Sequence, residues 1–205
     1  VNGLVFSEQG LVNDEPFKEG NIFIQSVEIN ELLYNSLGYT LHLGCYSSNA
    51  TISQVSSVTL PEDLIAISKR GLALTSIKSF AVSSKINEIS QAAFAGDTKL
   101  ETVDFTNANS LYSIRESAFY GCTSLTEICL PSNLSIIGSN AFEGCTKLKT
   151  VTFTSYLPPV LGDDALPLAE GSKLEKVYVP KGRLNDYSFA WRNNPSLVKL
   201  LTELE

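Results

Sequence analysis

The sequence of 205 residues predicts an α/β repeat solenoid that is rich in short parallel strands and contains few helices. Three observations predict this fold class. One pattern recurs along the second half of the chain, each copy ends in an alternating apolar segment typical of a short strand, and each copy is too small to bury its own apolar side chains. Stacked copies would share one continuous core.

The repeated unit is clearest in residues 86–105, 111–130 and 134–153. In each segment an aliphatic pair is followed by Ala-Phe, then by Gly, and then by Leu-x-x-aliphatic-x-apolar. The landmarks recur at steps of 25 and 23 residues: Phe94, Phe119 and Phe142; Gly96, Gly121 and Gly144; Leu100, Leu125 and Leu148. A spacing shared by so many positions indicates one structural unit that is repeated.

Two further copies extend the array in both directions. A looser copy runs from Val160 to Val179, with inserted residues between Leu166 and Leu174. An earlier copy at residues 57–68 matches residues 127–138 in its apolar pattern. We therefore expect a solenoid of about five coils over residues 57–182.

Each copy should contribute one short strand and one tight turn to the solenoid. Alternation over residues 127–130 places Ile128 and Leu130 inward, and the equivalent strands should pair in parallel, about 4.8 Å apart. The glycine after each Ala-Phe can adopt a positive φ at low steric cost. One Phe per coil at a fixed position indicates an internal stack rather than a ligand-binding stripe. The predicted inward residues are Ile89, Phe94, Leu100, Val103, Ile114, Phe119, Leu125, Ile128, Ile137, Phe142, Leu148 and Val151.

These residues resemble the BspA-like leucine-rich repeats, also grouped as the Treponema-type class. The family's unit is aliphatic-x-x-Ile-Gly-x-x-Ala-Phe-x-Gly-Cys-x-x-Leu-x-x-Ile-x-Ile-Pro, and residues 137–153 follow it closely up to the final Pro. Residues 114–131 keep Pro131 but have Arg115 in place of the first Gly. The resemblance implies a secreted or surface-anchored bacterial protein that binds host or matrix proteins, or that spaces other modules. It brings no catalytic residues with it.

The two ends of the chain are expected to cap the array. Residues 177–191 are similar to the closing cap of such arrays, and Leu184, Tyr187, Phe189 and Trp191 would cover the last coil. We therefore assign residues 183–205 to a C-terminal cap. Residues 1–56, which have six acidic side chains and one basic side chain in their first fifty positions, are assigned to an N-terminal capping region. Within it, residues 22–29 and 39–43 have strand-like alternation, and residues 31–38 could form a helical turn.

Composition excludes several classes of partner. The net charge of −7 and the isoelectric point near 4.8 argue against nucleic acid and against an anionic membrane surface. No apolar run is long enough to span a bilayer. Because the chain begins at Val1 and contains no Met, a processed product fits, and we expect an extracellular or cell-surface-anchored protein whose signal segment is not in this sequence.

His42 and Cys45 form the one arrangement that resembles a metal or Cys-His pair. A structural zinc site needs a second pair of ligands, and a Ser-His-Asp triad needs a nucleophile motif, and neither accompanies His42. We expect no metal, no cofactor and no catalytic residue. Asp163-Asp164 is interpreted as a solvated turn, with a weak calcium contact as the alternative. Asn49 and Asn133 begin N-glycosylation patterns, which matter only if the source glycosylates.

The cysteines differ in their expected positions. Cys122 and Cys145 occupy equivalent positions in neighbouring copies, and we expect them to be buried free thiols without a mutual disulfide. Alternation places Cys129 outside the core. Asp97 stands in the position of Cys122 one copy earlier, where a local polar role is conceivable.

A binding surface is expected on the outward side of the strands. Alternation assigns to it Thr102, Asp104, Glu127, Cys129, Thr150, Thr152, Lys176 and Tyr178. The main functional hypothesis is a non-enzymatic module, a monomer, that binds a protein or glycan there. A passive spacer within a larger surface protein is the alternative, because Thr also simply favours exposed strand positions. An enzyme that uses His42 is the third hypothesis, and no motif supports it.

Overall fold

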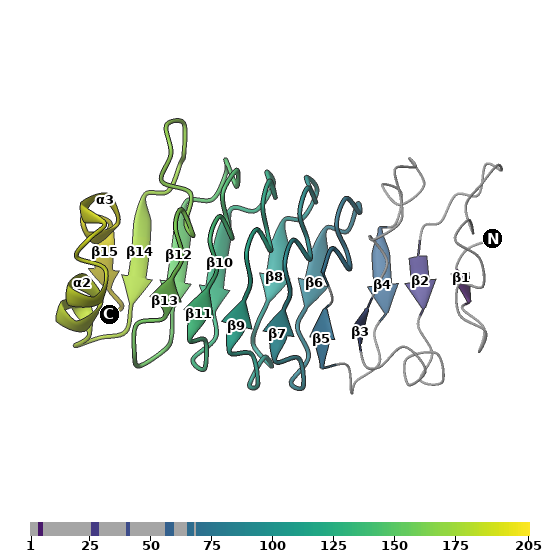
Figure 1. Ribbon diagram of the computed structural model, residues 1–205, viewed down its shortest axis with the longest axis horizontal. Helices are drawn as coiled ribbons and strands as arrows, with labels where there is room; N and C mark the ends of the chain where they lie inside the picture. The colour runs from purple at the N-terminus through teal and green to yellow at the C-terminus, as the bar shows by residue number, and fades with distance from the viewer. Residues whose placement is uncertain (1–3, 6–25, 29–39, 42–55, 60–64, 68) are drawn as a thin grey trace.

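The computed structural model describes residues 4–5, 26–28, 40–41, 56–59, 65–67 and 69–205, and these residues form a solenoid built on parallel strands. The successive coils follow one another along the long axis and end in a helical cap (Figure 1). Each complete coil supplies one strand to each of two ladders and a turn segment that joins them. This architecture confirms the predicted β-rich repeat solenoid with few helices.

The first ladder contains the longer strands. They pair in parallel in the orders β1-β2-β4, β6-β8 and β10-β12-β14-β15. In chain order these strands are β1 (Leu4–Val5), β2 (Ser26–Glu28), β4 (Ser57–Thr59), β6 (Ser79–Ala81), β8 (Thr102–Asp104), β10 (Glu127–Leu130), β12 (Thr150–Phe153), β14 (Lys176–Val179) and β15 (Leu201–Glu203). Equivalent positions of neighbouring copies are partners, as in Ile128 with Val151 and Val151 with Val177. The sequence period therefore determines the register.

The second ladder contains strands of two residues each. Its order is β13-β11-β9-β7-β5-β3, and all its pairs are parallel. The strands are β3 (Thr40–Leu41), β5 (Ala66–Ile67), β7 (Glu88–Ile89), β9 (Ser113–Ile114), β11 (Ile136–Ile137) and β13 (Val160–Leu161). The second residue of β5, β7, β9 and β11 is an isoleucine that is fully buried. This ladder thus supplies the aliphatic wall opposite the longer strands.

The turn segments after the second ladder stack through backbone hydrogen bonds between coils. The N–H of Phe94 donates to the carbonyl of Ala118 at 2.7 Å, and the N–H of Phe119 donates to the carbonyl of Ala141 at 2.8 Å. Gly96, which closes its turn, has φ +78°, a conformation that glycine adopts without a steric cost. The predicted Ala-Phe turn is therefore a third hydrogen-bonded side of the solenoid.

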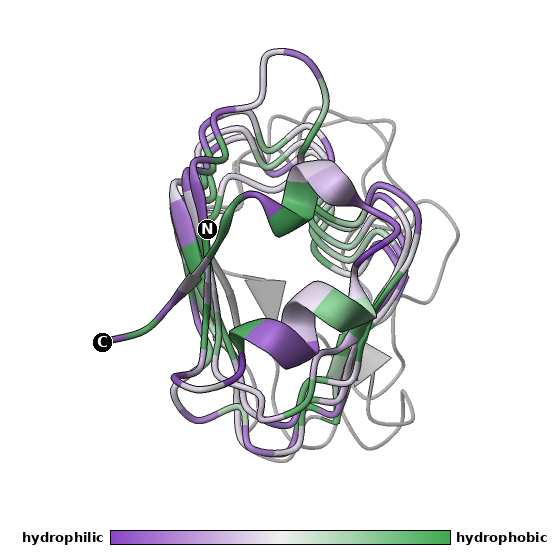
Figure 2. Ribbon diagram, turned by 90° about the vertical axis from the view of Figure 1, so that its left-hand side faces the viewer, coloured by the Kyte–Doolittle hydropathy of each residue, from purple (hydrophilic) through white to green (hydrophobic). Residues whose placement is uncertain are grey.

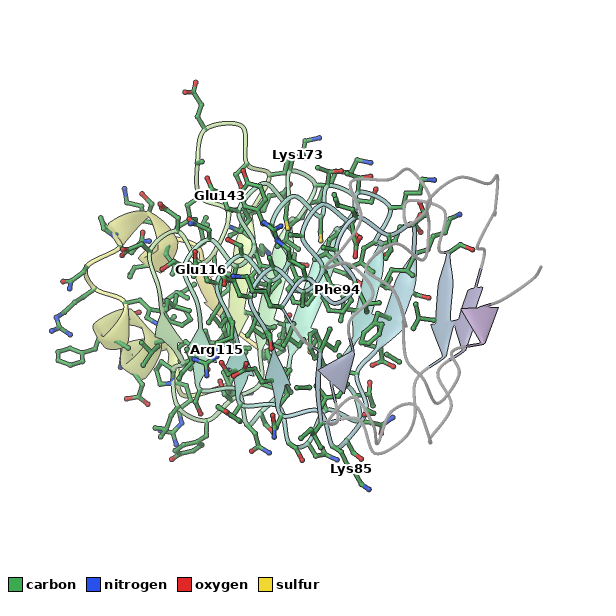
Figure 3. All side chains as sticks on the ribbon, turned by 45° about the vertical axis from the view of Figure 1, so that its right-hand side comes forward. Lys85, Phe94, Arg115, Glu116, Glu143 and Lys173 are labelled. Atoms are coloured by element: carbon green, nitrogen blue, oxygen red, sulfur yellow. The ribbon has the colours of Figure 1, made fainter. Side chains whose placement is uncertain are left out.

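The core runs without interruption through the coils. The rings of Phe94 and Phe119 stack with centroids 5.0 Å apart, and those of Phe119 and Phe142 stack at 5.2 Å. Figure 3 shows Phe94 between the walls of the coils. All twelve predicted inward residues are buried, which confirms that assignment. The phenylalanines are core residues and are not available to a ligand.

The repeat motif was not recognised at residues 69–82, although these residues lie inside the predicted array. β5, the turn segment that follows it and β6 form a complete coil, in which Leu72 replaces the stacked Phe and Phe80 pairs in register with Val103. Leu74 stands at the turn position that Gly96 occupies in the next coil, and its φ is +63°. These two replacements conceal the motif in the sequence.

The glycine at position 138 reflects close packing between coils. A Cβ atom at Gly138 would lie 2.4 Å from the backbone nitrogen of Glu116. The preceding coil has Arg115 at the equivalent position, and its guanidinium is paired with Glu88 at 2.7 Å. At Gly138 the backbone of the preceding coil therefore leaves no room for a side chain.

The ladder continues past the predicted boundary at residue 56. β4 pairs with β2 and β2 pairs with β1, all in parallel, and β3 pairs with β5. β2 and β3 lie within the segments predicted to have strand-like alternation. The predicted helical turn at residues 31–38 lies outside the described residues. The division into a cap of residues 1–56, a solenoid of residues 57–182 and a cap of residues 183–205 stays a prediction.

Two short helices close the C-terminal end, as the end-on view in Figure 2 shows. α2 (Leu184–Ala190) and α3 (Pro195–Val198) precede β15, which extends the first ladder. Tyr187 and Trp191 are buried, and both rings pack against Phe153 of β12. The prediction that Phe189 also covers the core is wrong. Because it lies two residues from each of those aromatic residues on one helix, it points away from them and is exposed.

Candidate binding surface

The predicted binding residues lie together on the outer side of the first ladder. They form the strand face, which comprises Thr102, Asp104, Glu127, Cys129, Thr150, Thr152, Lys176 and Tyr178. Thr150, Thr152 and Tyr178 are half-exposed and the other five are exposed. The residues between them, such as Val103 and Ile128, are buried. The alternation of exposure follows the period of two that the sequence predicted.

Register places these side chains in two rows across the coils. Glu127 pairs with Thr150, and Thr150 pairs with Lys176. Neighbouring strands of such a sheet lie about 4.8 Å apart, so side chains within a row can contact one partner together. The rows therefore form an extended surface rather than a pocket.

The second row begins at Cys129. Cys129 pairs with Thr152, and Thr152 pairs with Tyr178. β8, which has Asp104 at the equivalent position, lies beside β10, although the two strands belong to separately paired sheets (Figure 1). The break between these sheets divides the strand face into a part on β8 and a larger part on β10, β12 and β14.

Local interactions shift the pKa values of two side chains on this face, Asp104 and Cys129. The side chain and the backbone N–H of Thr106 hydrogen-bond to the carboxylate of Asp104 and lower its pKa, with the N–H donating at 2.8 Å. Partial burial and the nearby carboxylate of Glu127 raise the pKa of the Cys129 thiol. The ammonium of Lys176 lies 5.8 Å from the ring centroid of Tyr178. The strand face therefore has a charged side chain at each end, Asp104 and Lys176, and the neutral thiol of Cys129 between them.

The two buried cysteines have a structural role. Cys122 and Cys145 are free thiols, as predicted. The thiol of Cys122 donates to the carbonyl of Phe94 and that of Cys145 donates to the carbonyl of Phe119, both at 3.2 Å. Each thiol thus satisfies a backbone acceptor of the preceding coil. The neighbouring Cys145 thiol and burial raise the pKa of Cys122, so it stays protonated.

Asp97 occupies the cysteine position one coil earlier and behaves differently. Its carboxyl group is fully buried, and Oδ1 accepts hydrogen bonds from the backbone N–H and the hydroxyl of Thr75. Oδ2 is buried without a hydrogen-bond partner. Burial raises the pKa of Asp97 from 3.8 to about 8. This acid is a structural feature beneath the surface, because no solvent reaches it.

The other acidic and metal candidates that lie in the described part of the chain form no metal site. Asp163 and Asp164 are exposed on the turn side, where the backbone N–H of Asp163 donates to the hydroxyl of Ser139 at 3.2 Å. Among the described residues no group of three or more His, Cys, Asp or Glu side chains could hold a metal ion. His42, Cys45 and Asn49 lie outside the described residues. Asn133 is exposed, and its amide donates to the carbonyl of Asn109 at 2.5 Å.

Sequence reasoning overlooked one exposed apolar region. Tyr156 and Leu157, in the loop after β12, and Val160, at the start of β13, are exposed beside the C-terminal cap. The Pro-Pro pair at residues 158–159 fixes this loop and was the available signal. Within the described part of the chain no helix is both long enough and apolar enough to cross a membrane.

Comparison with protein families gives a clear result. The model described as the BspA type leucine-rich repeat region matches in six copies, over residues 19–111, 40–165 and 73–197. Together these matches cover most of the chain and extend across residue 56. Comparison with curated proteins found no match.

Several solved structures are similar to this chain. The pneumococcal vaccine antigen PcpA is 19% identical, with a TM-score of 0.54, and the match covers 88% of this chain and 49% of that one. A leucine-rich repeat protein from Bacteroides ovatus is 19% identical, with a TM-score of 0.44 and coverages of 89% and 54%. A leucine-rich cell surface protein from Faecalibacterium prausnitzii is 17% identical, with a TM-score of 0.49 and coverages of 78% and 56%. The chain spans about half the length of these structures.

Proposed function

Since the chain belongs to the BspA type leucine-rich repeat family, we propose that it is a non-enzymatic extracellular module that binds a protein or glycan on its strand face at the bacterial cell surface. The similarity to a pneumococcal vaccine antigen supports the location, because an antigen used in a vaccine is accessible from outside the cell. The module is proposed to act as a monomer, without a cofactor.

The observation that supports this proposal is the continuity of the larger part of the strand face. Its six residues on β10, β12 and β14 lie in register, and each of them is exposed or half-exposed. A solenoid built in this way provides an extended surface on which many modest contacts can add up. Catalysis would need convergent groups in a shielded pocket, which this architecture does not favour.

The chemistry of the face suits a macromolecular partner. Thr102, Thr150 and Thr152 offer hydroxyl groups that both donate and accept hydrogen bonds. Glu127 and Lys176 add one charge of each sign, and Tyr178 adds an aromatic ring that can stack on a sugar or an apolar side chain. Mixed polarity with one aromatic anchor is typical of protein interfaces and glycan surfaces.

The proposal is tested by binding the purified chain to an array of host extracellular proteins and glycans. Variants Thr152→Arg and Glu127→Arg alter the middle of the face without removing a buried group. Glu143→Arg introduces the same charge on the turn side, which Figure 3 shows away from the strands, and serves as the control. We expect the two face variants to weaken binding about tenfold or more while the control binds normally.

Two results would contradict the proposal. If only Glu143→Arg weakens binding while all three variants remain folded, the partner uses the turn side. If the unmodified chain binds nothing on the array, the chain is better described as a passive spacer within a larger surface protein.

A further inference from the structure

Asp97 is a buried acid that the proposed function does not use. Among the described residues it is the one Asp, Glu, Lys or Arg side chain that is buried. Its Oδ1 accepts the backbone N–H and the hydroxyl of Thr75 in the preceding coil, whereas its Oδ2 is buried without a hydrogen-bond partner. Because a buried negative charge is far more costly than a buried neutral group, this position favours the protonated acid.

No positive charge in the described chain stabilises the ionised form of Asp97. Thr75, which approaches it from the preceding coil, carries no charge. The Cys122 thiol interacts with it from the following coil, and Cys145 and burial raise the pKa of that thiol, so it is neutral. Burial raises the pKa of Asp97 to about 8, although the hydrogen bonds from Thr75 lower it. Loss of the proton therefore leaves a carboxylate without a counter-ion.

Thr75 and Asp97 lie on opposite sides of one junction between coils. The first coil contains β5, Thr75 and β6, and the second contains β7, Asp97 and β8. β5 pairs with β7, and β6 pairs with β8 beside it in the ladder (Figure 1). On the turn side the N–H of Leu72 donates to the carbonyl of Ala93 at 2.8 Å. We call this boundary the Asp97 junction.

The Asp97 junction lacks the ring stacking of the junctions that follow it. Phe94 stacks on the phenylalanine of the next coil with an interplanar angle of 6°. On its other side Leu72 stands at the Phe position, and Phe94 meets Phe80 edge-on, at 65°. Leu74 has φ +63°, where its Cβ is strained, at the turn position that Gly96 occupies in the next coil. Packing therefore favours this junction less than its successors.

The two following junctions contain thiols in place of the acid. Cys122 and Cys145 occupy the position of Asp97 in the next two coils, and each thiol donates to a carbonyl of the preceding coil at 3.2 Å. Neither junction buries a carboxyl group, so their hydrogen bonds do not change as an acid titrates. Ionisation of Asp97 therefore acts on one junction of the described solenoid.

We propose that the Asp97 junction is a pH-sensitive opening point, at which the coil with Thr75 separates from the coil with Asp97 when Asp97 loses its proton. Separation exposes the carboxylate to water and so removes the cost of burying its charge. Each coil of a repeat array contacts only its neighbours, and the coils from β8 onward therefore stay assembled. The residues of the strand face lie on these remaining coils, and the inference does not depend on what they bind.

The direction of the pH dependence follows from the raised pKa. The closed junction holds a proton that the open junction, with Asp97 near its usual pKa of 3.8, releases. The closed form is therefore favoured at low pH, and each pH unit between about 4 and about 8 increases the open population by up to about tenfold. Above about pH 8 both forms are ionised and the population levels off.

Hydrogen exchange of the complete chain tests the opening, measured residue by residue from about pH 5 to about pH 9 and corrected for the intrinsic exchange rate. Protection of the Leu72, Leu74 and Thr75 amides should fall by up to about tenfold per pH unit and level off above about pH 8. The amides of Phe119 and Gly121 make the equivalent turn-side hydrogen bonds two coils later, and their protection should not change.

Three variants identify the titrating group. Asp97→Asn removes the titration, and Asp97→Cys introduces the residue that the next two coils have at this position. In both variants the protection of Leu72 and Leu74 should be the same across the pH range. Asp104→Asn removes an exposed carboxylate from β8 and should keep the pH dependence of the unmodified chain.

Three results would overturn the proposal. Protection of Leu72 and Leu74 that does not change with pH in the unmodified chain would show that the junction does not respond to Asp97. An equal loss of protection at Phe119 would show that the whole solenoid opens together. A pH dependence that persists in the folded Asp97→Cys variant would assign the opening to another group.

Discussion

Asp97 and Thr75 hold two neighbouring coils together inside the core. Oδ1 of Asp97 accepts the backbone N–H of Thr75 at 2.5 Å and its hydroxyl at 3.2 Å. In the next two coils a cysteine thiol at the same position donates to a carbonyl, so the direction of hydrogen bonding is reversed at Asp97. The coil that contains Thr75 is therefore joined to the next coil by a buried acid.

This acid should make stability depend on pH. Because its pKa is raised from 3.8 to about 8 in the folded state, the folded chain keeps a proton that the unfolded chain releases between these values. Its contribution is therefore complete below about pH 4 and is lost as the pH rises toward about 8, with a slope of up to about 1.4 kcal/mol per pH unit. Urea unfolding across this range measures the slope.

Asp97→Asn should flatten that pH dependence and increase stability at the alkaline end. The control is Asp104→Asn, since the pKa of this exposed carboxylate is lowered and cannot contribute a slope above pH 5. An unchanged slope in Asp97→Asn would show that another group is responsible.

Phe119→Ala should lower the free energy of unfolding by about 3–5 kcal/mol. Phe119 lies between two stacked rings, so its removal leaves a void that neither neighbour can fill. Tyr120→Ala, at the adjacent and exposed position, is the control and should change stability by less than about 1 kcal/mol. Chemical denaturation compares the two, and equal losses would contradict the assignment of Phe119 to the core.

Gly138→Ala should destabilise the protein by about 1–3 kcal/mol, because the new Cβ would lie 2.4 Å from the backbone nitrogen of Glu116. The equivalent position in the preceding coil already has a side chain. Arg115→Ala should therefore cost less than about 1 kcal/mol, the value of its exposed ion pair with Glu88. Thermal unfolding of both variants tests this difference, and a neutral Gly138→Ala would mean that the coils can separate to accept a methyl group.

Tyr187→Phe should loosen the C-terminal cap. The hydroxyl of Tyr187 lies 2.8 Å from both the hydroxyl and the carbonyl oxygen of Ser155, which is buried. Loss of this group leaves buried polar atoms unpaired and should cost about 1–3 kcal/mol. Hydrogen exchange at α2 should accelerate relative to the unmodified chain. Tyr120→Phe, which removes an exposed hydroxyl, should leave that exchange unchanged.

Thiol alkylation should separate the cysteines by position. Cys129 is exposed and should be alkylated in the folded protein, slowly at neutral pH because its pKa is raised. Cys122 and Cys145 should be alkylated only after unfolding. Peptide mass analysis after alkylation reads out each site, and a crosslinked peptide pair containing Cys122 and Cys145 would contradict their assignment as free thiols.

The sequence predicted the core because burial repeats with the same period as the motif. It could not reveal the coil that contains β5 and β6 as easily, since Leu72 and Leu74 replace the diagnostic Phe and Gly. The partner of Asp97 was overlooked for the same reason, because Thr75 belongs to that coil. Tertiary packing accepts such substitutions, whereas recognition of a motif in the sequence requires the diagnostic residues.

The sequence predicted the residues of the strand face better than those of the C-terminal cap. Period-two alternation was sufficient to place Glu127 and Thr152 on one face. At the cap, apolar character alone did not show that Tyr187 is buried and Phe189 exposed. Residues two positions apart on a helix point in different directions, and this spacing would have separated them. The identity of a ligand cannot be predicted from an open face, because no pocket shape restricts what binds there.

The turn side makes the solenoid electrically polar along its axis. There the N–H groups of Arg70, Leu72 and Phe94, like those of their equivalents in later coils, all donate toward the following coil. Unlike the peptide groups of a strand, whose dipoles largely cancel, these dipoles point the same way and add. The positive end of the summed dipole lies toward the last turn, which contains the carboxylates of Asp163 and Asp164. These negative charges are favourable there, as acidic residues are in the first turn of a helix.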